Sequence, residues 1–135
     1  MPFGPAPLGF AYFVGVKFVG YSMAGSVLNR ACRTTRPRPL VFGAARTALG
    51  VAAGVAFGFV ASRFSLDPGS VQFLVALAPV RFGEWLLMLW LFYRSSGMTG
   101  GLWAASSLCG GLWSYALDLP AIWAMFIPPG GSWVC

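Results

Sequence analysis

Residues 74–94, LVALAPVRFGEWLLMLWLFYR, decide the fold because they are apolar over a length that crosses a membrane. A transmembrane helix needs ~20 mostly apolar residues to cross ~30 Å of hydrocarbon. Before Arg94, the charged residues in this run are Arg81 and Glu84. Charges inside a membrane are costly and usually face the interior of a bundle or a water-filled cavity. The stretch therefore predicts a membrane helix that carries a polar site.

The composition of the whole chain favours the same class. Hydrophobic residues make up 58% of the 135 residues and charged residues 9%, and the mean hydropathy is +0.74. A soluble domain is about half apolar and a quarter charged. We therefore predict a single transmembrane domain, residues 1–135, in a plasma or inner membrane.

The distribution of apolar residues predicts an all-α, polytopic integral membrane protein with four transmembrane helices. The predicted spans are residues 8–28, 40–61, 71–93 and 100–126, separated by segments with helix-breaking residues. No positive charge precedes the first span, so we expect it to be retained rather than cleaved as a signal peptide. The fourth span is long and contains Pro120, which predicts a kink or break near this residue, followed by a short helix at the outer surface.

A basic segment between the first two spans indicates the orientation. Its members are Arg30, Arg33, Arg36 and Arg38. The positive-inside rule places such a loop in the cytoplasm, and both termini then lie on the opposite side. Basic residues at this depth also attract anionic head groups. In so apolar a chain we expect this basic loop to contact lipid, and we expect no nucleic acid as partner.

Glycines at spacing four predict close helix packing in the second span. Gly50, Gly54 and Gly58 form a G-x-x-x-G-x-x-x-G pattern, which lets a neighbouring helix approach closely. We favour packing within the bundle over a homodimer face. Arg46 shares the glycine face and is expected to point into the bundle.

Ionisable residues fall inside all four predicted spans: Lys17, Arg46, Arg81, Glu84 and Asp118. At ~1.5 Å rise per residue, Lys17 and Arg81 lie ~15 Å below the outer edge. Arg46 and Glu84 lie ~20 Å below it, and Asp118 only ~3 Å. Arg81 and Glu84 are three residues apart, share one helix face and can pair directly. Three inner cations then accompany one inner carboxylate, and the excess positive charge needs an explanation.

Two explanations remain open. Lys17 and Arg46 can extend towards an interface or a water-filled crevice, and nothing is then bound. Alternatively, the cations line a cavity that holds a lipid phosphate or a small permeating anion. Arginine suits phosphate because its planar fork donates two parallel hydrogen bonds.

A polar stripe follows the fourth span. Ser107, Gly111 and Ser114 recur at helical spacing and lead to Asp118. The stripe predicts either serine-mediated helix packing or the lining of a crevice. Tyr21 and Tyr115 are candidate hydrogen-bonding partners beside it.

The residue types disfavour catalysis. The chain has no His, which excludes ligation of zinc or haem by histidine, and it has no nucleophile elbow or P-loop. We expect no metal or cofactor. We favour a non-catalytic accessory or assembly subunit that binds anionic lipid or a partner through its intramembrane charges, the partner being another membrane protein or a second copy. The alternatives are a small anion or proton-coupled transporter or channel and, least favoured, an enzyme acting on a lipid phosphate.

Overall fold

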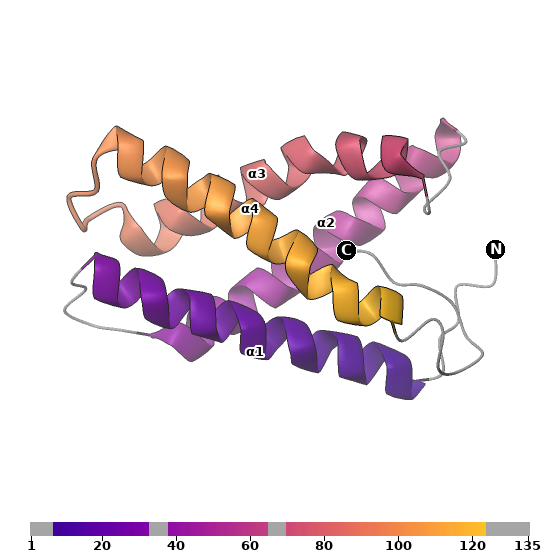
Figure 1. Cartoon of the computed structure of the whole chain (residues 1–135), viewed down its shortest axis with the longest axis horizontal. Helices are drawn as coiled ribbons and strands as arrows, with labels where there is room; N and C mark the ends of the chain where they lie inside the picture. Colours follow the sequence, from indigo (N-terminus) through magenta and orange to yellow (C-terminus); the bar gives the residue numbers. More distant parts are fainter. Residues whose placement is uncertain (1–6, 33–37, 65–69, 124–135) are drawn as a thin grey trace.

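The computed structural model describes residues 7–32, 38–64 and 70–123, and these form four α-helices (Figure 1). The helices are α1 (Pro7–Ala31), α2 (Pro39–Arg63), α3 (Val71–Tyr93) and α4 (Gly100–Trp123). The all-helical prediction is confirmed for this part of the chain.

Local sequence explains where three of the helices begin. Pro39 occupies the first position of α2, where its fixed φ suits a helix and its missing N–H costs nothing. The Ser70 side chain accepts a 3.1 Å hydrogen bond from the Phe73 amide and caps α3. Thr99 Oγ1 accepts from the Leu102 amide at 3.4 Å at the start of α4.

Three helices are long and apolar enough to cross a membrane, consistent with an integral membrane protein. They are α1 from Phe10 onward, α2 and α3. These segments have 22, 25 and 23 residues, and at ~1.5 Å rise per residue each is at least ~33 Å long, enough for the hydrocarbon core. The described part of α4 is not among these candidates, because glycine, serine and tryptophan lower its hydropathy. A fourth span is thus not confirmed.

Pro120 does not break α4. The helix continues through this residue to Trp123, so the chain does not break there, and the alternative of a kink at Pro120 stays a prediction. Proline removes one N–H and strains one turn, but apolar helices tolerate it where neighbouring groups re-satisfy the backbone. Pro79 lies inside α3 in the same way. The short helix predicted after Pro120 and residues 124–126 of the predicted fourth span lie outside the described residues.

The helices alternate in direction. Helices consecutive in the chain pack together, and α1 also packs against α4, which closes the bundle. Figure 1 shows that the end of α1 and start of α2 lie at the same end of the bundle as the end of α3 and start of α4. The orientation of this end towards the cytoplasm stays a prediction.

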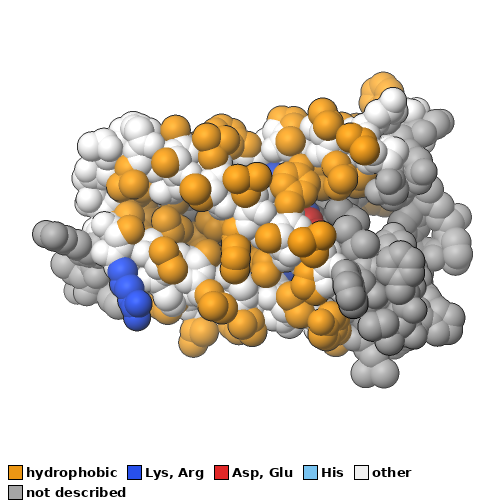
Figure 2. Space-filling view, viewed as in Figure 1, with side chains coloured by type: hydrophobic (Ala, Val, Ile, Leu, Met, Phe, Trp, Pro, Cys, Tyr) orange, Lys and Arg blue, Asp and Glu red, His pale blue; other side chains and the backbone are white. Residues whose placement is uncertain are grey.

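Large apolar side chains cover the outside of the bundle. Figure 2 shows them spread over the visible face with few charges among them. More than half exposed are Tyr12, Val19, Met23, Val27, Leu40, Val41, Phe59, Val60, Phe64, Val71, Val75, Leu91, Leu108, Leu112 and Leu119. Such a surface is suited to lipid.

The interior contains two separate apolar clusters. One consists of Tyr21, Phe42, Trp85, Met88, Leu89 and Tyr93. The other consists of Ala61, Phe73 and Leu77, between α2 and α3. Along α3, Arg81 and Glu84 lie between the two clusters. The fold therefore places its charged residues in the middle of the bundle.

Candidate functional site

Five charged side chains, one or two from each helix, meet inside the bundle and are called the charge cluster here. They are Lys17 of α1, Arg46 of α2, Arg81 and Glu84 of α3, and Asp118 of α4, and none is more than 7% exposed. Charges removed from water are costly unless they are paired and hydrogen-bonded. The pairing within the cluster therefore decides what it can do.

The ion pairs run between helices rather than along one. Arg46 Nη2 lies 2.6 Å from Glu84 Oε2, and Arg81 Nη2 lies 2.7 Å from Asp118 Oδ2. Arg81 and Glu84 share the inner face of α3, as predicted, but each extends to a different neighbouring helix. The expected direct pair between them is therefore replaced by two interhelical pairs.

Asp118 belongs to the cluster. Its Oδ1 contacts the Lys17 ammonium while its Oδ2 binds Arg81. The sequence counts one inner carboxylate, Glu84, and the contacts of Asp118 with Lys17 and Arg81 add a second one to the cluster. Three cations and two carboxylates leave the cluster with a formal excess of one positive charge.

The Ser114 hydroxyl is shared by three groups. It accepts hydrogen bonds from Trp85 Nε1 at 2.9 Å and from Arg46 Nη2 at 3.3 Å. The Tyr21 hydroxyl lies 3.2 Å from the same oxygen. Ser114 therefore links all four helices at the level of the Arg46–Glu84 pair, which fits the polar stripe predicted for α4.

Aromatic rings stabilise the cations further. The Arg46 guanidinium carbon lies 4.8 Å from the centre of the Tyr21 ring and 5.4 Å from that of Trp85. The Lys17 ammonium lies 5.1 Å from the Phe13 ring, and Arg81 lies 5.8 Å from that of Tyr115. Cation–π contacts of this kind contribute ~2 kcal/mol or more when the groups are desolvated.

Several donors of the cluster have no hydrogen-bond acceptor among the described residues. They are the Nε and Nη1 atoms of Arg46 and of Arg81. Such buried N–H groups are uncommon in native structures. The cluster therefore combines excess positive charge with hydrogen bonds left to donate.

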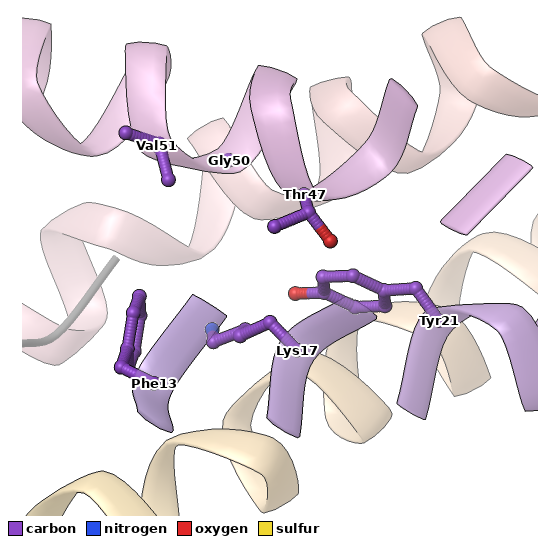
Figure 3. Close-up of a pocket in the computed structure, with 6 residues that line it drawn as sticks. All are labelled: Phe13, Lys17, Tyr21, Thr47, Gly50 and Val51. Atoms are coloured by element: carbon purple, nitrogen blue, oxygen red, sulfur yellow. The ribbon is translucent and has the colours of Figure 1, made fainter. Parts of the chain in front are cut away.

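A small cavity lies between α1 and α2 at the edge of the charge cluster. It holds about 10 Å³, which is room for one water-sized particle. Figure 3 shows Lys17, Tyr21 and Phe13 of α1 on one side and Thr47, Gly50 and Val51 of α2 on the other. Lys17 thus belongs to both the charge cluster and the cavity wall, and Tyr21 lines the cavity beside it.

The glycines of the G-x-x-x-G-x-x-x-G pattern in α2 lie in different environments. Gly50 is buried and lines the cavity. Gly54 is partly buried, and Gly58 is exposed with no neighbouring atom within 4 Å of where a Cβ would be. Close helix contacts occur instead at Gly43 against Ser22 and at Gly110 against Trp85.

Three further residues of α4 that the sequence singles out are not members of the ion pairs. Ser107 is buried, and its hydroxyl has no hydrogen-bond partner in the described segments. Gly111 is partly buried with open space at its Cβ position. The Tyr115 hydroxyl donates to the Leu74 carbonyl at 2.8 Å.

Sequence reasoning missed Trp85 and Phe13. Trp85 is 1% exposed and lies against Tyr21, Phe42 and Gly110. Trp85 directly follows the intramembrane Glu84 in the sequence, and a buried indole needs an acceptor for its N–H. This adjacency to a polar residue was the sequence feature that could have identified Trp85.

The basic loop is described in part. Arg30 lies exposed in the last turn of α1, and Arg38 lies exposed just before α2. Arg33 and Arg36 lie outside the described residues. Arg94, at the same end of the bundle, stacks on the Trp90 ring at 5.1 Å.

Among the described residues there is no group of three or more His, Cys, Asp or Glu side chains that could hold a metal ion. Comparison of the chain with protein-family models, curated proteins and solved structures finds no match. The charge cluster, its unpaired donors and the adjoining cavity are therefore the basis for a functional assignment.

Proposed function

We propose that the protein is a small, non-catalytic integral membrane protein whose charge cluster binds an anionic group, and that it serves as an accessory or assembly subunit of a membrane complex. In this proposal α4 is the fourth span and both termini face away from the cytoplasm. The anionic group belongs to a lipid head group or to a small ion.

The observation that carries the proposal is the charge balance of the cluster. Three buried cations accompany two buried carboxylates, and Arg46 and Arg81 each keep two nitrogen atoms without an acceptor among the described residues. An uncompensated charge in a low-dielectric interior is costly. Binding one anion neutralises the excess and supplies an acceptor for donors of this kind.

The accessory role is supported by the outer half of α2. Gly58 is exposed with open space beside it, and Val55 and Phe59 are at least half exposed. Small residues next to large apolar ones are typical of faces where membrane helices associate. A helix of a partner protein or of a second copy fits this face.

Transport of a small anion is the second candidate, and the cavity between α1 and α2 favours it. Arginine and lysine line anion pathways in other channels. Catalysis on a lipid phosphate is less well supported, because Glu84 and Asp118 are both held in ion pairs and neither is available as a general base.

Anion binding is tested by thermal unfolding in mild detergent. The protein is measured in sodium gluconate, sodium chloride and sodium phosphate, and with added phosphatidylglycerol or phosphatidylcholine. A ligand that binds only the folded state raises the Tm, so we expect chloride, phosphate or phosphatidylglycerol to raise it.

The matched variants are Lys17→Met and Arg94→Met. Each removes one positive charge, the first inside the charge cluster and the second outside it. Lys17→Met leaves two cations with two carboxylates and should abolish the Tm increase, whereas Arg94→Met should keep it. Equal responses of both variants would count against the cluster as the binding site. Native mass spectrometry tests the accessory role, because it reports a partner chain, a second copy and bound lipid together.

A further inference from the structure

Glu84 is the member of the charge cluster that can most easily leave its partner. It is 7% exposed, whereas the other four residues are at most 2% exposed. Within the described part of the chain, its ion pair and its hydrogen bond both run from Oε2 to Arg46 Nη2. Asp118, in contrast, is held at both oxygens, by Lys17 and by Arg81. Releasing Glu84 therefore breaks one ion pair, whereas releasing Asp118 breaks two.

Arg46 has contacts that hold it in place when Glu84 turns away. It is 0% exposed, and its guanidinium carbon lies 4.8 Å from the centre of the Tyr21 ring and 5.4 Å from that of Trp85. Its Nη2 also donates to Ser114 Oγ at 3.3 Å. A carboxyl group that rotates away from Arg46 therefore leaves a space the size of a carboxylate, with a charged donor directed at it.

The space that Glu84 leaves selects a small monovalent anion. A carboxylate oxygen fills it in the structure, 2.6 Å from Arg46 Nη2, so chloride or formate fits the same position. Arg46 Nε and Nη1 have no acceptor among the described residues and can donate further hydrogen bonds. The formal excess of one positive charge in the cluster attracts the anion. A phosphate group is larger and carries more charge than the carboxylate that it would replace.

A proton makes the exchange of Glu84 for an anion favourable. A released Glu84 that stays ionised is a buried carboxylate without a cation, which is costly in the bilayer interior. A protonated carboxyl carries no charge and can donate its own O–H. An ionised Glu84, in contrast, competes with the anion for Arg46. Anion binding and proton uptake by Glu84 therefore favour each other.

The other charged and titratable side chains around this pair are held by different partners. Lys17 and Arg81 both bind Asp118, and the hydroxyls of Tyr21 and Tyr115 each bond to a residue of another helix. Histidine is the side chain that ordinarily changes charge between about pH 5 and pH 8, and the chain has none. A dependence of anion binding on pH in this range is therefore informative about Glu84.

We infer that the protein binds a small monovalent anion together with one proton. The anion binds to Arg46, and Glu84, which occupies that position in the structure, takes up the proton from solution. The inference rests on the proposed anion binding and adds the class of anion and the control of the site by pH.

The test measures chloride binding to the unmodified protein as a function of pH. The Tm is recorded in mild detergent, in mixtures of sodium gluconate and sodium chloride at equal ionic strength, between about pH 5 and about pH 8. Uptake of one proton with each anion predicts that the chloride concentration needed for a fixed increase in Tm falls by up to about tenfold for each pH unit towards acid. A pH-indicator dye in weakly buffered solution should report proton uptake when chloride is added.

Glu84→Gln and Asp67→Asn are the matched variants. Glu84→Gln keeps the size of the side chain and, like the protonated carboxyl, carries no charge. It should bind chloride at about pH 8 as well as the unmodified protein does at about pH 5, without proton uptake. Asp67→Asn removes the acidic residue of the chain that is not part of the charge cluster and should keep the pH dependence. The two measurements on the unmodified protein decide the coupling whether or not Glu84→Gln folds.

Four results would count against the inference. A chloride response that does not change with pH would overturn the coupling and leave the proposed anion binding intact. A pH dependence that persists in Glu84→Gln would overturn the role of Glu84. A response to phosphate or phosphatidylglycerol but not to chloride or formate would overturn the class of anion. No response to any of these anions would overturn the proposed anion binding as well.

Discussion

Arg81 and Asp118 join α3 to α4 through an ion pair in which Nη2 lies 2.7 Å from Oδ2. The other oxygen of the same carboxylate contacts the Lys17 ammonium of α1. One acidic side chain therefore connects three helices, whereas Glu84 forms an ion pair with Arg46 of α2. The two carboxylates of the charge cluster thus differ in how many helices they hold together through ion pairs.

Asp118→Asn should destabilise the bundle more than Glu84→Gln. Removing one partner of a buried ion pair costs about 3–5 kcal/mol, and Asp118→Asn removes the partner of two cations at once. The free energy of unfolding in mixed detergent micelles measures both variants. A loss for Glu84→Gln that equals or exceeds the loss for Asp118→Asn would contradict the shared role of Asp118.

Ser114→Ala and Ser107→Ala form a matched pair on α4. Ser114→Ala leaves the Trp85 indole N–H without its acceptor and weakens the contacts of Arg46 and Tyr21, at a cost of about 1–3 kcal/mol. Ser107 is equally buried, but its hydroxyl has no partner in the described part of the chain, so its removal should be neutral or stabilising. The same unfolding experiment measures both, and equal losses would argue against Ser114 as a shared acceptor.

Gly110→Ala and Gly111→Ala place the same methyl group at two adjacent positions of α4, one closely packed and one open. A Cβ at Gly110 would overlap the buried Trp85 ring, whereas a Cβ at Gly111 has no neighbour within 4 Å. We expect Gly110→Ala to cost about 1–3 kcal/mol by overpacking and Gly111→Ala to have little effect. A change in Trp85 fluorescence should accompany only the first substitution, and its absence would contradict the packing of α4 on α3.

Cys109 reports whether α4 crosses the membrane. Its side chain is exposed on the outside of α4, and a thiol surrounded by lipid reacts slowly because maleimides react with the hydrated thiolate. In a Cys32→Ser, Cys135→Ser variant we expect Cys109 to resist maleimide in intact membranes and to react after denaturation in detergent. Rapid labelling in membranes would place this face of α4 in water.

Cys32, just after α1, should react slowly near neutral pH. Burial raises the pKa of the Cys32 thiol, and a hydrogen bond with the Ser96 side chain opposes this shift. A raised pKa leaves less thiolate, so in a Cys109→Ser, Cys135→Ser variant the maleimide rate at pH 8 should be below that of the unfolded chain and rise with pH. Ser96→Ala should lower the rate further, and a faster reaction would contradict the assigned hydrogen bond.

The helices were predictable because the length of each apolar segment can be counted in the sequence. Residues 71–93 coincide with α3, and residues 40–61 lie within Pro39–Arg63 of α2. The burial of Arg46 and Glu84 followed from the cost of placing a charge in lipid. These inferences need only the rise of a helix and the hydropathy of its residues.

The ion pairs were not predictable because they depend on how helices are rotated and offset relative to one another. Spacing along α3 places Arg81 and Glu84 on one face, but a long side chain there can extend to either neighbour. The contacts of Asp118 with Lys17 and Arg81 depend on how α4 packs against α1 and α3, which the sequence of α4 alone does not give. The role of Trp85 depends on a contact with Gly110 that no single-helix pattern contains.

The pairing of charges between distant helices also has a consequence for the order in which the protein is made. The partners Arg46 and Glu84 are 38 residues apart and Arg81 and Asp118 are 37 apart, and Asp118 is synthesised last of the five. A nascent chain that ends after α3 carries Lys17 and Arg81 without the carboxylate that they share. For the proposed four-span protein we therefore expect the first three helices to stay beside water or the insertion machinery until α4 emerges, so that the bundle closes as a unit rather than helix by helix.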